Sequence, residues 1–188
     1  MRRLAVFVSG SGSNAENIIK HFAKDDETEV ALVLSDKAEA FGLERARRHN
    51  IEALYYSRQD FLESDKVLKT LEDRRIDFIV LAGFLCYVPQ NIITNYAGRI
   101  VNIHPSLLPK YGGKGMYGAN VHRAVVANGE KESGITIHHI NENFDDGEII
   151  FQAKCKVLPT DTAEDVEKKV RALEILHFPS VIERELKK

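Results

Sequence analysis

Short apolar runs alternate with helical patterns along the first hundred residues of the chain. The runs lie at residues 4–8, 30–34, 76–81 and 100–103, with a weaker one at 51–55, and continuous runs of this length are typical of strands buried on both faces. Between them, apolar positions spaced for one face of a helix fall at residues 15–23, 39–49 and 61–73, and a further helix is expected to begin near Pro89. Strands that alternate with helices in this way predict a parallel sheet with right-handed crossovers.

The pattern changes after residue 104. Four further elements are expected there: an irregular glycine-rich loop at 110–120, a helix at 121–128, and two antiparallel strands at 134–140 and 149–157. A last amphipathic helix is expected after a cap within 160–162, and Pro179 is expected to kink or restart it. Its predicted buried positions are Val166, Val170, Leu173 and Leu176. We therefore predict an α/β fold with a mostly parallel twisted sheet, an antiparallel carboxyl-terminal strand pair and flanking helices.

Composition narrows the class of protein. The chain has 188 residues, 44% of them hydrophobic and 29% charged, which suits one domain with a substantial core. A formal charge of −2 gives no electrostatic reason to expect nucleic acid or a membrane as partner. The two cysteines are isolated, so neither a disulfide framework nor a zinc motif is indicated. The apolar run near the start is too short for a signal peptide, and a cytoplasmic location is predicted.

A serine- and glycine-rich turn follows the first strand. Residues 9–14 read Ser-Gly-Ser-Gly-Ser-Asn and lead into the first helix, where Ser13 and Glu16 fit a capping box. Glycines let the backbone approach an anion, and the N–H groups at a helix start favour phosphate. The turn is neither a Walker A motif nor a dinucleotide fingerprint. A phosphate site and a tight, well-capped turn both remain open.

Asn102 and His104 form a candidate reaction centre. They stand two positions apart in an apolar run, so in a strand both side chains point to one face. Pro105 favours an extended conformation at His104 and ends the ladder. Carboxyl ends of strands are where open α/β sheets bind ligands. A hydrogen-bonded structural histidine is the competing interpretation.

Two other segments carry alternative interpretations. The apolar residues 82–88 follow a strand and form either a core turn or one wall of a slot for a flat aromatic ligand. The polar residues 141–148 form either a solvated hairpin tip or a loop whose carboxylate keeps His104 protonated or relays a proton. The histidines His104, His138 and His139, even with Asp145, lack typical ligand spacing, so no metal is expected.

Four segments occur in the order found in the phosphoribosylglycinamide formyltransferases, and the chain resembles this family over essentially its whole length. They are residues 9–14, residues 81–84 (Leu-Ala-Gly-Phe), residues 102–109 (Asn-Ile-His-Pro-Ser-Leu-Leu-Pro) and residues 145–150 (Asp-Asp-Gly-Glu-Ile-Ile). The third segment is typical of enzymes that use formyltetrahydrofolate, and the first points to the ribonucleotide enzymes. The resemblance implies a single Rossmann-like formyltransferase domain over residues 1–188, with a phosphate-binding half (1–100) and a catalytic and folate-binding half (101–188).

The resemblance also implies an activity. The family transfers a formyl group from 10-formyltetrahydrofolate, a cosubstrate, to the amine of glycinamide ribonucleotide in purine biosynthesis. Transfer proceeds by direct attack through a tetrahedral intermediate and uses no metal. A monomer or homodimer is expected. The alternatives are a formyltetrahydrofolate hydrolase and a non-catalytic phosphate- or folate-binding relative.

Site residues follow from the same resemblance. The implied catalytic residues are Asn102, His104 and Asp145. The implied ribonucleotide contacts are Gly12, Ser13, Asn14, Arg171 and Glu174. The implied folate contacts are Leu85, Cys86, Tyr87, Val88, Asn102, Asn141 and Phe144. Two features depart from the family pattern: the loop at 110–118 is longer and richer in glycine, and Cys86 stands where many members carry a basic residue.

Overall fold

The computed structural model describes residues 1–141 and 147–188, which divide into two compact units, Met1–Val101 and Asn102–Lys188. The strands follow the order β3-β2-β1-β4-β5-β6-β7 in a seven-stranded sheet. Parallel pairing joins β1 to β2, β1 to β4 and β2 to β3, whereas β6 and β7 pair antiparallel. The predicted mostly parallel sheet with an antiparallel carboxyl-terminal pair is therefore confirmed.

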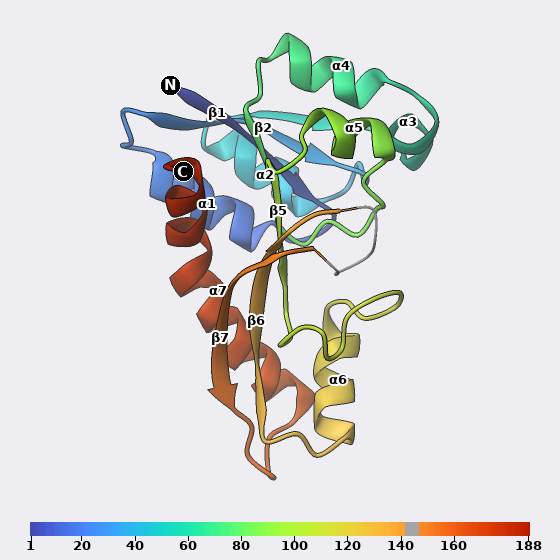
Figure 1. Cartoon of the computed structure of the whole chain (residues 1–188), viewed down its shortest axis with the longest axis vertical. Helices are drawn as coiled ribbons and strands as arrows, with labels where there is room; N and C mark the ends of the chain where they lie inside the picture. The colour runs from blue at the N-terminus through green and yellow to red at the C-terminus, as the bar shows by residue number, and fades with distance from the viewer. Residues whose placement is uncertain (142–146) are drawn as a thin grey trace. The chain divides into compact units, whose positions relative to one another are not determined.

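The first unit is built from strand–helix repeats around β1. Its elements are β1 (Arg2–Val8), α1 (Ser13–Phe22), β2 (Thr28–Ser35), α2 (Phe41–Arg48), β3 (Glu52–Tyr55), α3 (Arg58–Glu63), α4 (Lys66–Asp73), β4 (Phe78–Leu81), α5 (Gln90–Asn95) and the start of β5 (Ile100–His104). From Leu4 to Val8, β1 is fully buried, as its apolar run predicts. Along the chain, β2 and β3 are added on one side of β1, and β4 and β5 are then added on its other side. Right-handed crossovers therefore put α1 and α2 on one face and α3, α4 and α5 on the other (Figure 1).

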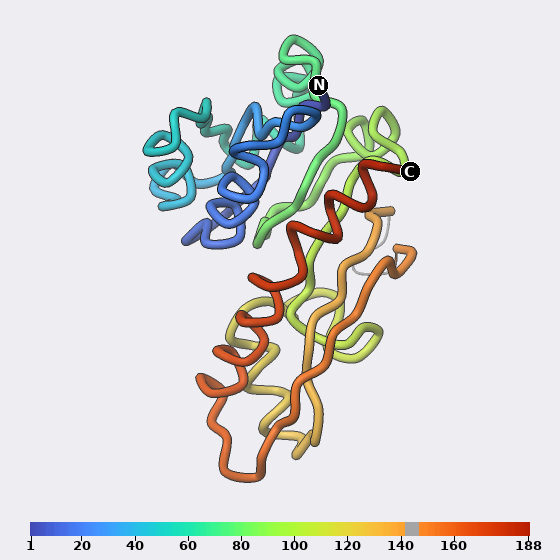
Figure 2. Tube along the Cα trace, turned by 90° about the vertical axis from the view of Figure 1, so that its left-hand side faces the viewer, coloured from blue at the N-terminus to red at the C-terminus, as the bar shows by residue number. Residues whose placement is uncertain are grey.

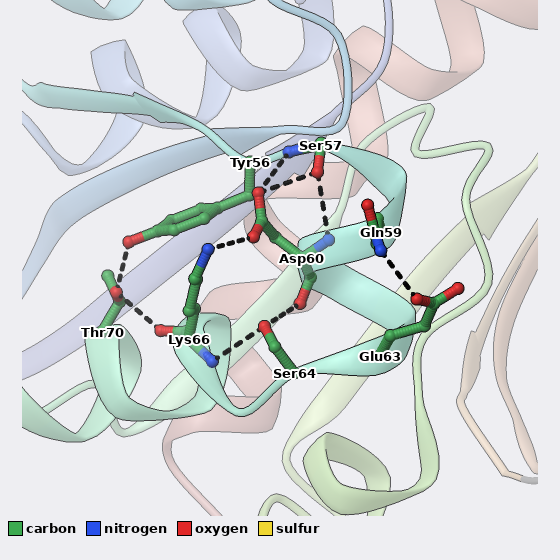
Figure 3. Close-up of polar contacts among 8 residues, drawn as sticks. All are labelled: Tyr56, Ser57, Gln59, Asp60, Glu63, Ser64, Lys66 and Thr70. Carbon is green, nitrogen blue, oxygen red and sulfur yellow. Dashed lines mark hydrogen bonds and ion pairs between the residues drawn. The ribbon is translucent and has the colours of Figure 1, made fainter.

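The helix expected at 61–73 is two helices, which corrects the sequence-based boundary. Ser57 caps α3 in a capping box with Asp60, so this helix begins earlier than its apolar residues suggest. Ser64 ends it: its hydroxyl donates to the Asp60 carbonyl at 2.7 Å and accepts from the Lys66 N–H at 3.3 Å (Figure 3). The hydroxyl thus satisfies one backbone C=O and one backbone N–H at the junction, and α4 begins just after it.

The capping box expected at Ser13 and Glu16 is also wrong. The N-cap of α1 is Gly12, in a left-handed conformation (φ 69°), and no side chain caps this helix. The Glu16 carboxylate instead pairs with Arg45 and, at 3.1 Å, with His49, both from the α2 region. The hydrogen bond with His49 is the main cause that lowers the pKa of Glu16. Glu16 therefore ties α1 to α2 and leaves the N–H groups of the first turn without a side-chain cap.

The second unit contains the end of β5, α6 (Ala119–Ala127), β6 (Glu132–His139), β7 (Ile149–Lys156) and α7 (Ala163–Leu186). Helix α7 runs beside the β6–β7 pair and also contacts α6 (Figure 2). Residues 105–118 contain neither helix nor strand, so the irregular stretch predicted at 110–120 is confirmed up to residue 118, and α6 begins two residues earlier than expected. In the part of the chain that the structure describes, no helix combines the length and apolar character needed to cross a bilayer.

Helix α7 confirms two predictions and corrects two. Thr162 caps it in a capping box with Asp165, within the predicted cap. The helix then runs through Pro179 as one element, so the expected restart is wrong, whereas the alternative of a kink stays a prediction. Val166 and Val170 are buried as predicted, and Leu173 is half-buried. Leu176 is 67% exposed, so its predicted burial is wrong. Past Val170, the buried face of α7 is taken up by Phe178, Pro179, Val181 and Ile182.

Candidate active site

The turn after β1 lies directly against the start of α2. The Gly42 N–H donates to the Gly10 carbonyl at 3.0 Å. A Cβ on Gly12 would overlap the Gly42 Cα, and the left-handed φ of Gly12 also disfavours a side chain. Ser13 and Asn14, the other two implied ribonucleotide contacts, open α1, with Asn14 buried. The turn thus presents an uncapped helix start, the arrangement that suits an anion.

Ser9 joins this turn to the segment that contains the implied folate contacts. Its hydroxyl donates to Asp36 at 2.5 Å and accepts from the Leu85 N–H at 2.8 Å. Its backbone N–H donates to the Gly83 carbonyl at 3.1 Å. Just before the implied folate contacts in the chain, Phe84 packs edge-on against Phe7 of β1, with ring centroids 5.3 Å apart. The phosphate-type turn and the apolar segment are therefore brought together at the carboxyl ends of β1 and β4.

The implied folate residues of this segment alternate in exposure. Leu85 is exposed, Tyr87 is half-buried, and Cys86 and Val88 are buried. Burial raises the pKa of the Cys86 thiol, and the negative charge of Asp36 adds to the shift. Cys86 is therefore a buried, uncharged side chain at neutral pH.

In the second unit, Asn102 is oriented by a histidine. The Asn102 amide nitrogen lies 3.1 Å from His138 Nε2, and His138 Nδ1 lies 2.9 Å from the His139 carbonyl. A carbonyl only accepts and an amide nitrogen only donates, so these two contacts place a proton on His138 Nδ1 and make its Nε2 the acceptor from the Asn102 amide. His138 is fully buried. The amide of Asn102 is thereby fixed with its nitrogen toward His138, and it retains a second N–H.

His104 is oriented by the loop that follows β5. Its Nε2 donates to the Tyr111 carbonyl at 2.8 Å, which places a proton on Nε2. The imidazole is 5% exposed. Because Asn102 and His104 are two positions apart on β5, their side chains lie on the same face of the strand. The predicted side-by-side amide and imidazole are thus present, each with a fixed partner.

Thr136 of β6 anchors the turn between these residues and the loop. Its fully buried hydroxyl donates to the Ser106 carbonyl at 2.7 Å and accepts from the Leu108 N–H at 3.0 Å. Gln152 of β7 donates to the Leu108 carbonyl at 3.0 Å. The apolar motif after His104 is therefore pinned by polar groups of both antiparallel strands.

His122 is a third buried histidine and lies near His104. His122 on α6 is 3% exposed, and burial lowers its pKa, with the proximity of His104 acting in the same direction. His122 is therefore neutral at pH 7 and adds no positive charge beside His104.

The polar loop is described only at its two ends. Asp145 and Phe144, an implied catalytic residue and an implied folate contact, lie outside the described residues, and Asn141 is half-buried at the edge of the described part. The His139 N–H donates to the Glu148 carbonyl at 2.9 Å, which closes the base of the loop. A Cβ on Gly147 would overlap the His139 carbonyl, so this position of the Asp-Asp-Gly-Glu motif requires glycine.

Arg171 and Glu174, the remaining implied ribonucleotide contacts, lie on α7. Arg171 is exposed and Glu174 is half-buried. Both belong to the second unit, as do Asn102 and His104. Among the described residues, no group of three or more His, Cys, Asp or Glu side chains is arranged to hold a metal ion.

Sequence reasoning missed three residues that orient the site: Ser9, Tyr111 and His138. The spacing of His138 excludes only a metal-ligand role, but a histidine in an otherwise apolar strand also signals a buried polar partner. Nothing local distinguishes Tyr111, which acts through its backbone carbonyl.

Comparisons with known proteins bear on this arrangement. Residues 2–182 match the family model described as formyl transferase. A phosphoribosylglycinamide formyltransferase of Haemophilus influenzae is 40% identical over 187 residues, which cover 97% of this chain and 86% of the relative. A chloroplastic phosphoribosylglycinamide formyltransferase of Arabidopsis thaliana is 39% identical over 177 residues; the match covers 90% of this chain but only 60% of that longer protein. The crystal structure of glycinamide ribonucleotide transformylase 1 from Geobacillus kaustophilus superposes with a TM-score of 0.88 at 35% identity, covering 97% of each chain.

Proposed function

The chain belongs to the formyl transferase family, and from that premise we propose that it transfers the formyl group of 10-formyltetrahydrofolate to the amine of glycinamide ribonucleotide in purine biosynthesis. The observation that carries the proposal is the pair Asn102 and His104, each oriented by its own hydrogen bond on one face of β5. The two substrates are small molecules, with no nucleic acid or membrane involved and no metal required. A cytoplasmic location, a single formyltransferase domain over residues 1–188 and a monomer or homodimer remain predictions.

The reaction exchanges one carbon–nitrogen bond for another. The substrate amine attacks the formyl carbon, and the carbonyl oxygen becomes an oxyanion in a tetrahedral intermediate. The bond between the formyl carbon and the folate nitrogen then breaks, the amine loses one proton, and the folate nitrogen gains one. The products are a formamide and tetrahydrofolate. The protein must therefore stabilise the oxyanion and move a proton.

Asn102 supplies the first oxyanion donor in this proposal. One of its two amide hydrogens goes to His138 Nε2. The second is the one proposed to donate to the oxyanion. Because His138 fixes which end of the amide is nitrogen, the amide oxygen is kept away from the oxyanion. A preorganised donor of this kind costs no reorganisation when the charge develops.

His104 supplies the second donor as an imidazolium. Its Nε2–H donates a hydrogen bond to the Tyr111 carbonyl. A hydrogen bond from the ring to the substrate must therefore come from an N–H at Nδ1. A neutral imidazole with its proton on Nε2 has none on Nδ1. Donation to the oxyanion therefore requires the doubly protonated ring, and Asp145 is proposed to favour that form and to take part in moving the proton.

The remaining proposed contacts bind the two substrates. The N–H groups of Gly12, Ser13 and Asn14 at the start of α1 hold the ribonucleotide phosphate, with Arg171 and Glu174 as further ribonucleotide contacts. The folate contacts are Leu85, Cys86, Tyr87, Val88, Asn102, Asn141 and Phe144. With Cys86 neutral, charge recognition of the folate tail is assigned to other residues.

The test separates binding from chemistry in three variants. His104→Ala, Asn102→Ala and Asp145→Asn are expected to bind glycinamide ribonucleotide with affinity near that of the parent chain, measured by calorimetry, and to lose acceptor-dependent turnover. Cys155→Ser, a substitution outside the proposed site, is the control for handling and folding. Full turnover in His104→Ala would refute the catalytic assignment. Formyl release in the parent chain without the ribonucleotide would move the assignment to a hydrolase.

A further inference from the structure

One carboxylate holds two consecutive side chains of the loop after β5. Glu130, between α6 and β6, accepts from Lys110 Nζ with both oxygens, at 3.0 and 3.1 Å, and from the Tyr111 hydroxyl at 3.0 Å. Its hydrogen bond with Lys110 is the main cause that lowers the pKa of Glu130, and the Tyr111 hydroxyl lowers it further. Burial raises the pKa of the Tyr111 phenol, with Glu130 contributing. At neutral pH the carboxylate is therefore ionised and the phenol remains a donor.

The clamped residue has a backbone conformation that side chains disfavour. Tyr111 has φ 55°, in the left-handed region, although Gly112 and Gly113 stand next to it. Glycine would adopt this conformation without a steric penalty, so the neighbours of Tyr111 must hold it there. The preceding carbonyl, of Lys110, is held as well, because the Ser106 hydroxyl donates to it at 2.6 Å.

The conformation of Tyr111 decides where its carbonyl points. In the structure that carbonyl accepts from His104 Nε2 at 2.8 Å. A change of Tyr111 to a right-handed or extended conformation would rotate the peptide and move the oxygen away from the imidazole. The chain of contacts is therefore continuous from Glu130 through Tyr111 to His104.

We propose that Glu130 and Tyr111 are positioning residues for His104, an inference that rests on the proposed role of His104 in formyl transfer. Glu130 clamps Tyr111 in its left-handed conformation, and the Tyr111 carbonyl fixes both the ring orientation of His104 and the proton on Nε2. Nδ1 is thereby kept as the nitrogen that faces the reacting formyl group. The Lys110 side chain is exposed, and an ion pair with an exposed lysine by itself stabilises a fold very little, so a purely structural role of the pair predicts a small effect of its removal.

The experiment measures turnover and the protonation of His104 in the same full-length variants. Glu130→Ala is expected to lower kcat about tenfold while both KM values stay within about twofold, because a misaligned acid affects the transition state more than substrate binding. Nitrogen-15 NMR of histidine-labelled protein is expected to show loss of the Nε2–H form at His104. Tyr111→Phe is expected to behave similarly, and the double variant is expected to lose less than the product of the two single losses.

Two further variants separate positioning from stability. Glu130→Gln keeps an oxygen that accepts from the Tyr111 hydroxyl, so it is expected to recover most of kcat and the Nε2–H signal of His104. Glu132→Ala is the matched control: like Glu130→Ala it removes one negative charge, and it breaks an exposed ion pair with Lys154, whose Nζ lies 3.2 Å from the carboxylate. This variant is expected to match the parent chain in kcat and in the His104 spectrum.

The outcomes are distinct. A parent-like kcat and His104 spectrum in Glu130→Ala would overturn the inference. So would a loss of activity that only tracks unfolding, with the remaining folded protein showing parent-like His104 signals. If His104→Ala itself kept full turnover, the proposed catalytic assignment would fail instead, and the NMR result would still report whether the clamp exists.

Discussion

The close approach between Gly12 and Gly42 makes Gly42→Ala a sharp test of the proposed anion-binding turn. Gly42 lies in the first turn of α2, and its Cα faces Gly12 at the start of α1. A Cβ at Gly42 would stand 2.8 Å from Val8 Cγ2 and 3.1 Å from the Gly12 Cα. Val8 is fully buried in β1 and has little room to rotate. The strain must therefore move α2 or the turn itself.

The size of the effect follows from these distances. The two contacts fall short of an ordinary 3.4 Å contact by about 0.6 and 0.3 Å. Overpacking on this scale typically costs about 1–3 kcal/mol. For a chain of this length, that corresponds to a melting temperature lower by roughly 2–12 °C. Loss of part of one charge-assisted hydrogen bond to phosphate, about 1.4 kcal/mol, would raise the KM for glycinamide ribonucleotide about tenfold.

Thermal unfolding and steady-state kinetics measure both quantities. We expect the KM for the ribonucleotide to rise more than the KM for the folate, because the displaced N–H groups belong to the turn. Gly10→Ala is the matched control for stability: nothing lies within 4 Å of its Cβ, so its melting temperature should stay near that of the parent chain. A parent-like melting temperature together with an unchanged ribonucleotide KM in Gly42→Ala would refute the reasoning.

Three other predictions concern chemistry, stability and pH. His104→Ala removes one proposed oxyanion donor and is expected to lower the single-turnover rate about 10²–10³-fold; a loss below about threefold would contradict that role. Ser57→Ala removes the cap of α3 and is expected to cost about 1 kcal/mol in urea unfolding, whereas an unchanged midpoint would show that the capping box contributes nothing. Because burial raises the pKa of Cys86, its alkylation in Cys155→Ser protein should still be accelerating above pH 9; a plateau below pH 9 would contradict that shift.

The strand–helix alternation of the first unit was predictable because its signals are local. A run such as residues 4–8 has no polar position, so only a strand buried on both faces suits it. The break at Ser64 was not predictable from periodicity, since it depends on a serine hydroxyl bonding to the backbone on both sides. Leu176 shows the other limit: it matches the helical period but is exposed, because the period alone does not say where the buried face of a long helix shifts.

In the site, too, features set by local sequence were predictable and features set by distant residues were not. The i, i+2 spacing of Asn102 and His104 on a strand was sufficient to predict a shared face. Their partners were not predictable, because His138 is 36 positions from Asn102, and Tyr111 acts through a carbonyl that every residue possesses. The glycine at 42 likewise has no local explanation; its reason is the approach of Gly12, 30 positions earlier.

The most direct test of the central claim follows the formyl carbon. The protein is mixed with 10-formyltetrahydrofolate labelled with carbon-13 at the formyl group, with and without glycinamide ribonucleotide, and the products are observed by NMR. We expect the label to appear as a formamide at the rate at which tetrahydrofolate forms, and only when the ribonucleotide is present. Label released as free formate at the same rate without the ribonucleotide would contradict formyl transfer to the amine.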